Sequence, residues 1–379
     1  MDNYKSIKKI ALLHPTFGYN GGAENVILST AKSFYNLEIE TSIYTYKLRY
    51  NIPDYIRQFK TNITLNPFVF KKTARFLCNE LINYDAILIH NFPATIFFGF
   101  AYDEAKKNNI ELPKSFWYCH EPVIRLYGYD DESYKKLQNT FDFIARYTMY
   151  LDKLGVSKID YIISNSVRTK EGVKRVYNRD SKVIYPSISQ IDTNNIIQIN
   201  DSKHFIYIGR IEKSKNLENS IYAFRNMLKK INNENLQFII AGRGKFENYL
   251  KKLVKKIKME NNIIFKGFVS EEEKNQLLNT SYAMIMPAIN EPFGLTVIEA
   301  LYSSCISIIS NKSGVYEVVK NCSVNCDMSN IDDIEKSILF VYNNKNIKKN
   351  ILSKSKNIIN NFTINTYSNN ILNYIETNL

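Results

Sequence analysis

The sequence is poor in cysteine, and none of its apolar runs is long enough to cross a bilayer. Its five cysteines are odd in number and scattered; Cys322 and Cys326 are the closest pair, and no second Cys or His cluster accompanies them. We therefore expect reduced, mostly structural thiols and no zinc site. The longest apolar neighbourhood, Phe92 to Tyr102, is about half of a membrane span.

The sequence also lacks a secretory signal. Lys5, Lys8 and Lys9 precede a short apolar stretch, but His14 and Pro15 interrupt it and no small-residue cleavage site follows. We expect a cytoplasmic protein, either soluble or peripheral on the cytoplasmic face of a membrane.

Acidic residues are in deficit. The chain has 50 basic against 37 acidic residues, a formal net charge of +13. Such an excess fits a nucleic-acid binder, a protein of anionic membrane surfaces, or simply a lysine-rich composition. The lysines between Lys251 and Lys258 fall opposite apolar residues at helical spacing, which indicates a solvated helix face. We therefore expect no nucleic-acid partner.

A second basic segment, Phe68 to Leu77, interleaves aromatic residues with Lys71, Lys72 and Arg75. This combination suits the interface of an anionic bilayer, where each cation contributes about 1 kcal/mol. An amphipathic helix packed on its own sheet gives the same pattern. Peripheral membrane contact is a hypothesis, and the packed helix is the alternative to it.

The length and composition suit two α/β domains, since the chain has 379 residues of which 45% are hydrophobic and 13% aromatic. Apolar, strand-like segments alternate with helical stretches along both halves. They lie near Lys9, Ile39, Ala86, Ser115, Tyr161 and Val183 in the first half and near His204, Gln237, Ile263, Ala283 and Ser307 in the second. The polar segment from Ser187 to Lys203 has the composition of a linker between the two.

Two carboxylates, Glu291 and Glu299, flank a Pro-Phe-Gly turn between a predicted strand, Tyr282 to Pro287, and a predicted helix, Leu295 to Tyr302. Both acids therefore fall near the carboxyl end of a strand, where doubly wound sheets bind ligands. The helix N-terminus at that edge offers backbone N–H groups to an anion. A Glu near a helix start is also a common stabilising charge, so this segment does not establish a site by itself.

A glycine and two cations follow another predicted strand, His204 to Ile208, in the segment Gly209 to Asn216. Arg210 supplies a bidentate fork and Lys215 a point charge, and the two can converge on a diphosphate. A basic surface loop would look similar. The position favours a phosphate clamp, because this loop leaves its strand at the same sheet edge as Glu291.

Two further strand ends carry candidate residues. Gly21 and Gly22 open a predicted helix after the first strand, where adjacent glycines let the backbone approach a ligand closely. They are not a dinucleotide fingerprint, since Gly-x-Gly-x-x-Gly is absent. His120 ends a strand-like run that begins at Ser115, and an imidazole there can exchange hydrogen bonds with a substrate. A lone His is more often structural.

In this order and spacing, the motifs resemble those of the retaining glycosyltransferase family 4, over essentially the whole chain. The matching pieces are the Gly-Gly-Ala-Glu turn, the Tyr-Cys-His strand end, the Gly-Arg loop with its Lys-Asn, the Ala-Gly-Arg-Gly turn at 241–244 and the Glu-x7-Glu pair. The resemblance implies an α/β protein of the GT-B fold, with two Rossmann-like domains facing across a cleft. Residues 1–195 would bind the acceptor, residues 200–359 would bind the nucleotide-sugar donor, and a C-terminal helix at 360–379 would cross back to the first domain.

The resemblance also implies roles for single residues. His120 and Glu291 would be catalytic, with His120 near the reacting carbon and Glu291 on the donor sugar. Glu299 would bind the ribose hydroxyls, and the segment around Gly267 and Phe268 would face the base. The full set of donor-binding residues would be Gly21, Gly22, Arg210, Lys215, Phe293, Gly294, Leu295 and Glu299.

Such a site needs no metal ion, because two cations and helix N–H dipoles can stabilise the departing diphosphate. Consistent with this, no Asp-x-Asp occurs, and Asp130-Asp131 lies in a polar stretch typical of a solvated turn. We expect no metal and no other cofactor. For the family, a front-face mechanism is usually proposed, in which the anomeric configuration is kept and the leaving phosphate assists acceptor deprotonation. Hydrolysis is expected only as a slow side reaction.

Two short segments narrow the choice of donor sugar. His14-Pro15 and Tyr118-Cys119-His120 resemble the corresponding segments of mannosyltransferases that use GDP-mannose on lipid-linked oligosaccharides. Glu121 departs from the aromatic residue that many of them carry there. GDP-mannose is slightly favoured over UDP-glucose or UDP-N-acetylhexosamine, with a saccharide or lipid-linked saccharide as acceptor.

Two other classes of protein stay open as alternatives. A sugar-nucleotide 2-epimerase of the same architecture should show more acids and histidines than four His suggest, and a non-enzymatic polyanion-binding protein is supported only by charge.

Overall fold

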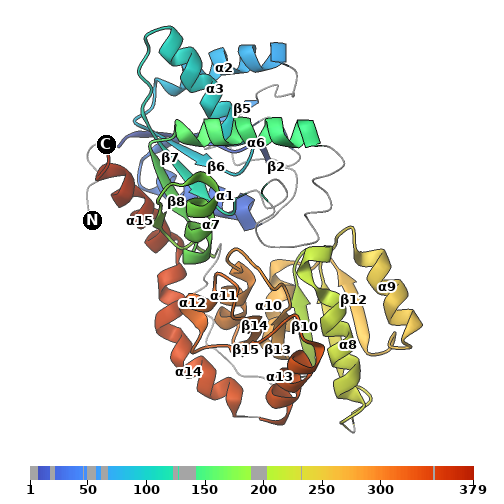
Figure 1. Cartoon of the computed structure of the whole chain (residues 1–379). Helices are drawn as coiled ribbons and strands as arrows, with labels where there is room; N and C mark the ends of the chain where they lie inside the picture. Colours follow the sequence, from blue (N-terminus) through green and yellow to red (C-terminus); the bar gives the residue numbers. More distant parts are fainter. Residues whose placement is uncertain are drawn as a thin grey trace. The chain divides into compact units, whose positions relative to one another are not determined.

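The computed structural model describes residues 7–17, 22–45, 47–48, 57–60, 67–122, 127, 142–188, 203–231, 233–344 and 346–379. The chain divides into an N-terminal unit, Met1–Ser189 with Ile364–Leu379, and a C-terminal unit, Gln190–Thr363 (Figure 1). Gly21, Asp130 and Asp131 lie outside the described residues, as does most of the expected linker.

The N-terminal unit is built on a seven-stranded parallel sheet. Across the sheet the strands are β5 (Arg57–Lys60), β3 (Glu40–Thr45), β1 (Lys9–Leu13), β6 (Ala86–His90), β7 (Lys114–Cys119), β8 (Tyr161–Ser164) and β9 (Lys182–Val183). The central strands β1, β6 and β7 are almost wholly buried, as a parallel sheet covered on both faces requires. A separate pair joins β2 (Thr16–Phe17) to β4 (Lys47–Leu48).

The helices of this unit are α1 (Gly22–Asn36), α2 (Pro67–Leu81), α3 (Ala94–Lys107), α6 (Asp142–Ser157), α7 (Val167–Tyr177) and α15 (Ile364–Glu376). Helix α2 packs on α3, and α3 packs on α6. The second contact is close, because a Cβ on Gly155 of α6 would lie 2.3 Å from the carbonyl oxygen of Thr95 on α3. Only glycine fits there.

The last helix, α15, belongs to the N-terminal unit, where it contacts α1 (Figure 1). It places the ring of Tyr367 edge-on against that of Tyr118 in β7, with centroids 5.6 Å apart. The predicted return of the final helix to the first domain is therefore confirmed. The helix begins at Ile364 rather than at 360, because Asn360–Phe362 form a separate 3-10 turn, η2, in the C-terminal unit.

The C-terminal unit has a six-stranded parallel sheet. Its strands, in order, are β12 (Ile263–Gly267), β11 (Gln237–Ala241), β10 (His204–Ile208), β13 (Ser281–Met286), β14 (Ser307–Ser310) and β15 (Val324–Cys326). The helices are α8 (Leu217–Leu228), α9 (Glu247–Lys256), α10 (Glu271–Asn279), α11 (Leu295–Tyr302), α12 (Tyr316–Val319), α13 (Ile331–Asn343) and α14 (Ile347–Ile359), preceded by the 3-10 turn η1 (Lys213–Lys215). Helix α13 packs on α8, and α14 packs on α11.

In both sheets the strand order reverses at the first strand of the unit. The reversal lies between β1 and β6 in the N-terminal unit and between β10 and β13 in the C-terminal unit. Right-handed connections then send the helices on either side of this point to opposite faces, which opens a crevice beyond the carboxyl ends of the strands. The prediction of two Rossmann-like domains is confirmed, and these two switch points are where ligands are expected.

Candidate functional site

Lys215 and Glu291 form an ion pair at the switch point of the C-terminal sheet. Lys215 ends η1 after β10, and Glu291 lies in the loop after β13. Lys215 Nζ lies 2.5 Å from Glu291 Oε2, and the two side chains are only 19% and 18% exposed. Both residues were predicted at this edge. The structure adds that their charges neutralise each other, so an anion that binds Lys215 must compete with Glu291.

Asn216 holds the cation loop in place. Its backbone is left-handed, with φ of 55°, and it separates η1 from α8. Its side-chain amide donates to the carbonyl oxygens of Met328 at 2.7 Å and Pro287 at 3.2 Å. The loop after β10 is thereby tied to the segments after β13 and β15. In the structure, Asn216 thereby positions the loop that carries Lys215.

Glycines bring the loops after β10 and β11 into contact. The Gly209 amide donates to Ala241 O at 3.0 Å, and the Ile211 amide donates to Arg243 O at 2.9 Å. A Cβ on Gly242, whose φ is +138°, would lie 1.9 Å from the carbonyl oxygen of Gly209. The Ala-Gly-Arg-Gly turn therefore lets the neighbouring loop approach closely.

Arg210, the second cation predicted to bind phosphate, lies on the loop after β10. Its side chain is exposed. Its carbonyl oxygen accepts a hydrogen bond of 2.7 Å from the hydroxyl of the buried Tyr207. The structure therefore fixes the backbone at Arg210, and convergence of the two cations on one ligand stays a prediction.

The Pro-Phe-Gly turn shapes the N-terminus of α11. Gly294, at φ +109°, is the N-cap and offers no side-chain acceptor to the first N–H groups of the helix, which begins at Leu295. The buried Phe293 packs on Phe362 with ring centroids 5.8 Å apart, and its carbonyl accepts from Val315 N at 2.9 Å. A helix N-terminus without a side-chain cap is suited to an anion.

Glu299 is held by a lysine that sequence reasoning missed. Lys274 Nζ of α10 lies 3.0 Å from Glu299 Oε2 and 2.7 Å from Glu271 Oε2. Burial alone would lower the pKa of Lys274, but the two carboxylates outweigh it and the pKa is raised. The ammonium therefore stays charged and orients the carboxylate of Glu299.

Phe268 stands out beside this edge because 75% of it is exposed. It follows Gly267, whose φ of +74° ends β12 in a left-handed turn. A Cβ on Gly267 would lie 2.7 Å from a guanidinium nitrogen of Arg243. The absence of a side chain at Gly267 therefore makes room for the guanidinium of Arg243.

Three of the four histidines gather at the switch point of the N-terminal sheet. His14 follows β1, His90 ends β6 and His120 follows β7. His90 Nδ1 lies 3.3 Å from His120 Nε2. Burial, helped by His14, lowers the pKa of His120 to about 3. Burial, then His120 and His14, hold the pKa of His90 well below its usual range.

Only His120 was singled out from sequence as a candidate for this edge. His14 and His90 lie at the ends of β1 and β6, on either side of the switch point. That these two strands are neighbours depends on the strand order of the sheet. The start of α1 lies beside these histidines: Gly22 is exposed there, and Glu24 Oε1 is 3.8 Å from His14 Nε2. On the other side, Asn165 Nδ2 donates to the carbonyl oxygen of His120 at 2.8 Å.

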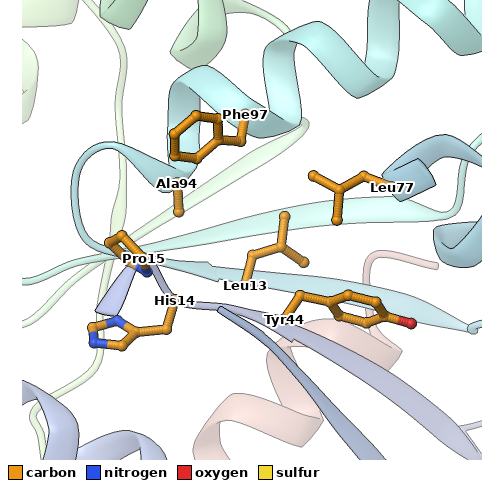
Figure 2. A pocket seen from close by; sticks show the side chains of 7 residues that line it. All are labelled: Leu13, His14, Pro15, Tyr44, Leu77, Ala94 and Phe97. Atoms are coloured by element: carbon orange, nitrogen blue, oxygen red, sulfur yellow. The ribbon is translucent and has the colours of Figure 1, made fainter. Parts of the chain in front are cut away.

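A small apolar pocket lies under the end of β1. Figure 2 shows Leu13, Ala94 and Phe97 directed toward one another, with the ring of His14 on the opposite side of the strand from Leu13. The pocket is lined by Leu13, His14, Pro15, Tyr44, Leu77, Ala94 and Phe97, and its volume is about 10 Å³. That is room for one water at most, so it is a packing gap rather than a sugar site.

The basic segment on α2 is partly packed. Leu77 and Leu81 are buried, whereas Lys72 and Arg75 are exposed. Arg75 Nε pairs with Glu104 Oε1 of α3 at 3.2 Å. The amphipathic-helix alternative therefore describes one face of α2, and the other face carries cations.

The described part of the chain offers neither a membrane-spanning helix nor a metal-binding cluster. No helix there combines the length and apolar character that crossing a bilayer requires. No group of three or more His, Cys, Asp or Glu side chains there is arranged to hold a metal ion.

Comparisons with known proteins agree with this architecture. A family model described as glycosyl transferases group 1 matches residues 190–361. The O-antigen chain mannosyltransferase RfbU of Salmonella typhimurium is 26% identical over 199 residues, 52% of this chain and 53% of its own length. The α-1,3/1,6-mannosyltransferase ALG2 of Mus musculus is 29% identical over 226 residues, 54% of this chain and 53% of its own. The chain spans about half the length of the first curated relatives it matches.

A solved glycosyltransferase structure from Rickettsia africae superposes with a TM-score of 0.74 and covers 98% of each chain, at 18% identity. That likeness supports the fold alone. Together with the two parallel sheets, it leads to one conclusion: the chain has the GT-B fold, and its residues 190–361 are similar to the glycosyl transferases group 1 family.

Proposed function

We propose that the protein is a retaining, metal-independent glycosyltransferase that moves a hexose from a nucleotide-diphosphate sugar to a saccharide or lipid-linked saccharide. The observation that carries this proposal is the pairing of Lys215 with Glu291 at the C-terminal switch point. A cation for phosphate and a carboxylate for sugar hydroxyls there occupy the position where doubly wound sheets bind nucleotides.

The donor would bind through groups of several loops at that edge. Lys215 and Arg210 would neutralise the diphosphate, supported by the N-terminus of α11. Glu299, held by Lys274, would accept hydrogen bonds from the ribose hydroxyls. The exposed ring of Phe268 would lie near the base. These groups can stabilise the leaving diphosphate before the reaction begins, so none of the roles calls for a metal ion.

The state of His120 supports a front-face mechanism. With a pKa of about 3, its imidazole is neutral at pH 7 and a weak base. It is suited to donate or accept one hydrogen bond with a sugar hydroxyl, and poorly suited to take a proton from the acceptor. The phosphate that leaves from the donor would take that proton instead. Glu291 would hold the transferred sugar.

GDP-mannose is the donor we favour, with UDP-sugars next. The support is that RfbU and ALG2, the two relatives described above, are named as mannosyltransferases. The gathering of His14, His90 and His120 is an observation that favours the alternative of a sugar-nucleotide 2-epimerase, which should surround its sugar with such groups. Chromatography of the products separates the two, since an epimerase yields an isomeric sugar without any acceptor.

A thermal-shift panel of nucleoside diphosphates and nucleotide sugars tests the donor site. A ligand at one hundred times its Kd stabilises the native state by about 2.7 kcal/mol, so one diphosphate should raise the melting temperature by several degrees. Lys215→Ala should reduce the shift to about a third, whereas the matched control Lys213→Ala, at an exposed lysine of the same loop, should keep it. A panel in which no nucleotide stabilises the protein would contradict the proposal.

We also propose that the exposed side of α2 docks on an anionic membrane that carries the acceptor. Each cation near such a surface contributes about 1 kcal/mol, so Lys72→Glu with Arg75→Glu, both at exposed positions, should release the protein from vesicles rich in anionic lipid. The matched control is Lys252→Glu with Lys255→Glu, the same charge change at exposed positions of α9. Equal sedimentation of both double variants with the vesicles would count against docking through α2.

A further inference from the structure

His90 carries a buried ring nitrogen that no described residue satisfies. The residue is 0% exposed at the end of β6, on the switch point of the N-terminal sheet. Its Nδ1 contacts His120 Nε2 at 3.3 Å, while its Nε2 has no hydrogen-bond partner among the described residues. A buried unpaired polar atom costs about 1–3 kcal/mol, so a phenylalanine or leucine would fill this position more favourably. The position therefore calls for an explanation other than packing.

The contact fixes where the protons are. A neutral imidazole has one N–H donor and one acceptor nitrogen, and burial keeps His90 neutral. If the proton of His90 were on Nε2, the structure would bury an unpaired N–H group. If it is on Nδ1, that N–H donates to His120 and only an acceptor lone pair is left unpaired. Unpaired buried donors are the rarer of the two, so the second arrangement is favoured.

The tautomer of His120 follows from that of His90. Since His120 Nε2 accepts the hydrogen bond, the proton of His120 must be on Nδ1. This Nδ1 makes no hydrogen bond within the described part of the chain. It is also not one of the side-chain atoms there that are both buried and without a hydrogen-bond partner. Solvent, or a bound substrate, can therefore reach it. Tyr118 packs against both rings, with centroids 5.5 Å from His90 and 4.9 Å from His120.

We propose that His90 is a positioning residue: it holds His120 in the Nδ1–H tautomer, so that His120 presents a single hydrogen-bond donor to the sugar. The part that concerns the sugar rests on the proposed function. The tautomer itself does not depend on it, and the two can be tested apart.

Nuclear magnetic resonance of protein labelled with nitrogen-15 in histidine gives the first test, without any substrate. The chain has four histidines, and each imidazole is assigned from the variant that lacks it. Long-range proton–nitrogen correlations identify the protonated nitrogen. His120 should be protonated on Nδ1. After His90→Leu it should shift toward the Nε2–H form, while His90→Asn, whose amide can donate from the place of Nδ1, should keep the wild-type pattern.

Kinetics give the second test. His90→Leu should lower kcat about tenfold with little change in the KM for the donor, and His90→Asn should restore most of it. His204→Asn, at the histidine outside the cluster, is the control and should leave the spectrum of His120 unchanged.

Two results would overturn the proposal: His120 protonated on Nε2 in the wild type, or a tautomer that His90→Leu leaves unaltered. The first needs no variant, so it decides even if His90→Leu fails to fold. The expected tautomer in a protein that transfers no sugar would support the positioning role and refute the proposed function.

Discussion

Removing the charge of Glu291 should tighten the binding of a free nucleoside diphosphate while slowing sugar transfer. The reason is the ion pair between Lys215 Nζ and Glu291 Oε2, 2.5 Å apart with side chains 19% and 18% exposed. The ammonium that is proposed to bind phosphate is already engaged. A diphosphate that binds it must either break this pair or lie beside the carboxylate.

The size of the effect follows from the energy of that pair. A hydrogen bond between charged groups contributes about 1.5–3 kcal/mol, and partial exposure places this one toward the lower end. If the diphosphate recovers about half of that energy, Glu291→Gln should strengthen its binding by about 1 kcal/mol, or about fivefold in Kd. Lys215→Ala removes the cation itself and should weaken binding by about 2 kcal/mol, or about thirtyfold.

Isothermal titration calorimetry of the diphosphate against four proteins measures these effects: the wild type, each single variant and the double variant. In the double variant the benefit of Glu291→Gln should shrink, because no ammonium is left to release. Glu212→Gln, on the same loop as Lys215, is the matched loss of charge. Weaker diphosphate binding by Glu291→Gln, or an unchanged Kd for Lys215→Ala, would refute the reasoning.

Three further outcomes are expected. Gly242→Ala places a Cβ 1.9 Å from the carbonyl oxygen of Gly209 at a φ of +138°, so calorimetry should show a lower melting temperature and about tenfold weaker diphosphate binding. The pKa of His120, about 3 in the folded state against about 6.5 unfolded, makes the unfolded state bind more protons between these values. Stability should therefore fall as the pH drops below 6.5, by at most about 2 kcal/mol at pH 5, and urea titrations of His120→Gln should show a smaller drop. Phe268→Ala removes a ring that is 75% exposed, so it should leave the melting temperature unchanged and weaken diphosphate binding severalfold in the same titration.

The central strands could be predicted because a parallel strand that is buried on both faces consists almost entirely of apolar residues. Such runs marked β1, β6, β10 and β13 in the sequence, each within a few residues of its observed bounds. The edge strand β5, with the sequence Arg-Gln-Phe-Lys, carries no such signal. An edge strand pairs through its backbone on one side only, so its side chains are less constrained by burial.

Candidate site residues could be proposed one by one from the sequence, but the contacts between them could not be predicted. Lys215 and Glu291 are 76 positions apart, and they meet because β10 and β13 are neighbours in the sheet. Lys274 follows three glutamates and looks like a member of a solvated helix, yet it is buried against Glu299. Sheet order, rather than any local pattern, brings such partners together.

The switch points of the two units, each taken by itself, carry different chemistry. The C-terminal unit offers the charged groups Lys215 and Glu291, whereas the N-terminal unit offers imidazoles whose pKa values are lowered by burial. A charged imidazolium would attract phosphate and compete with Lys215 for the diphosphate. A neutral His120 offers a hydrogen bond without that attraction, so it can discriminate in favour of the uncharged hydroxyls of a sugar. Under the proposed function, burial of His90 and His120 would serve specificity, and a substitution that hydrates this cluster should raise the affinity for free phosphate as it lowers the rate of transfer.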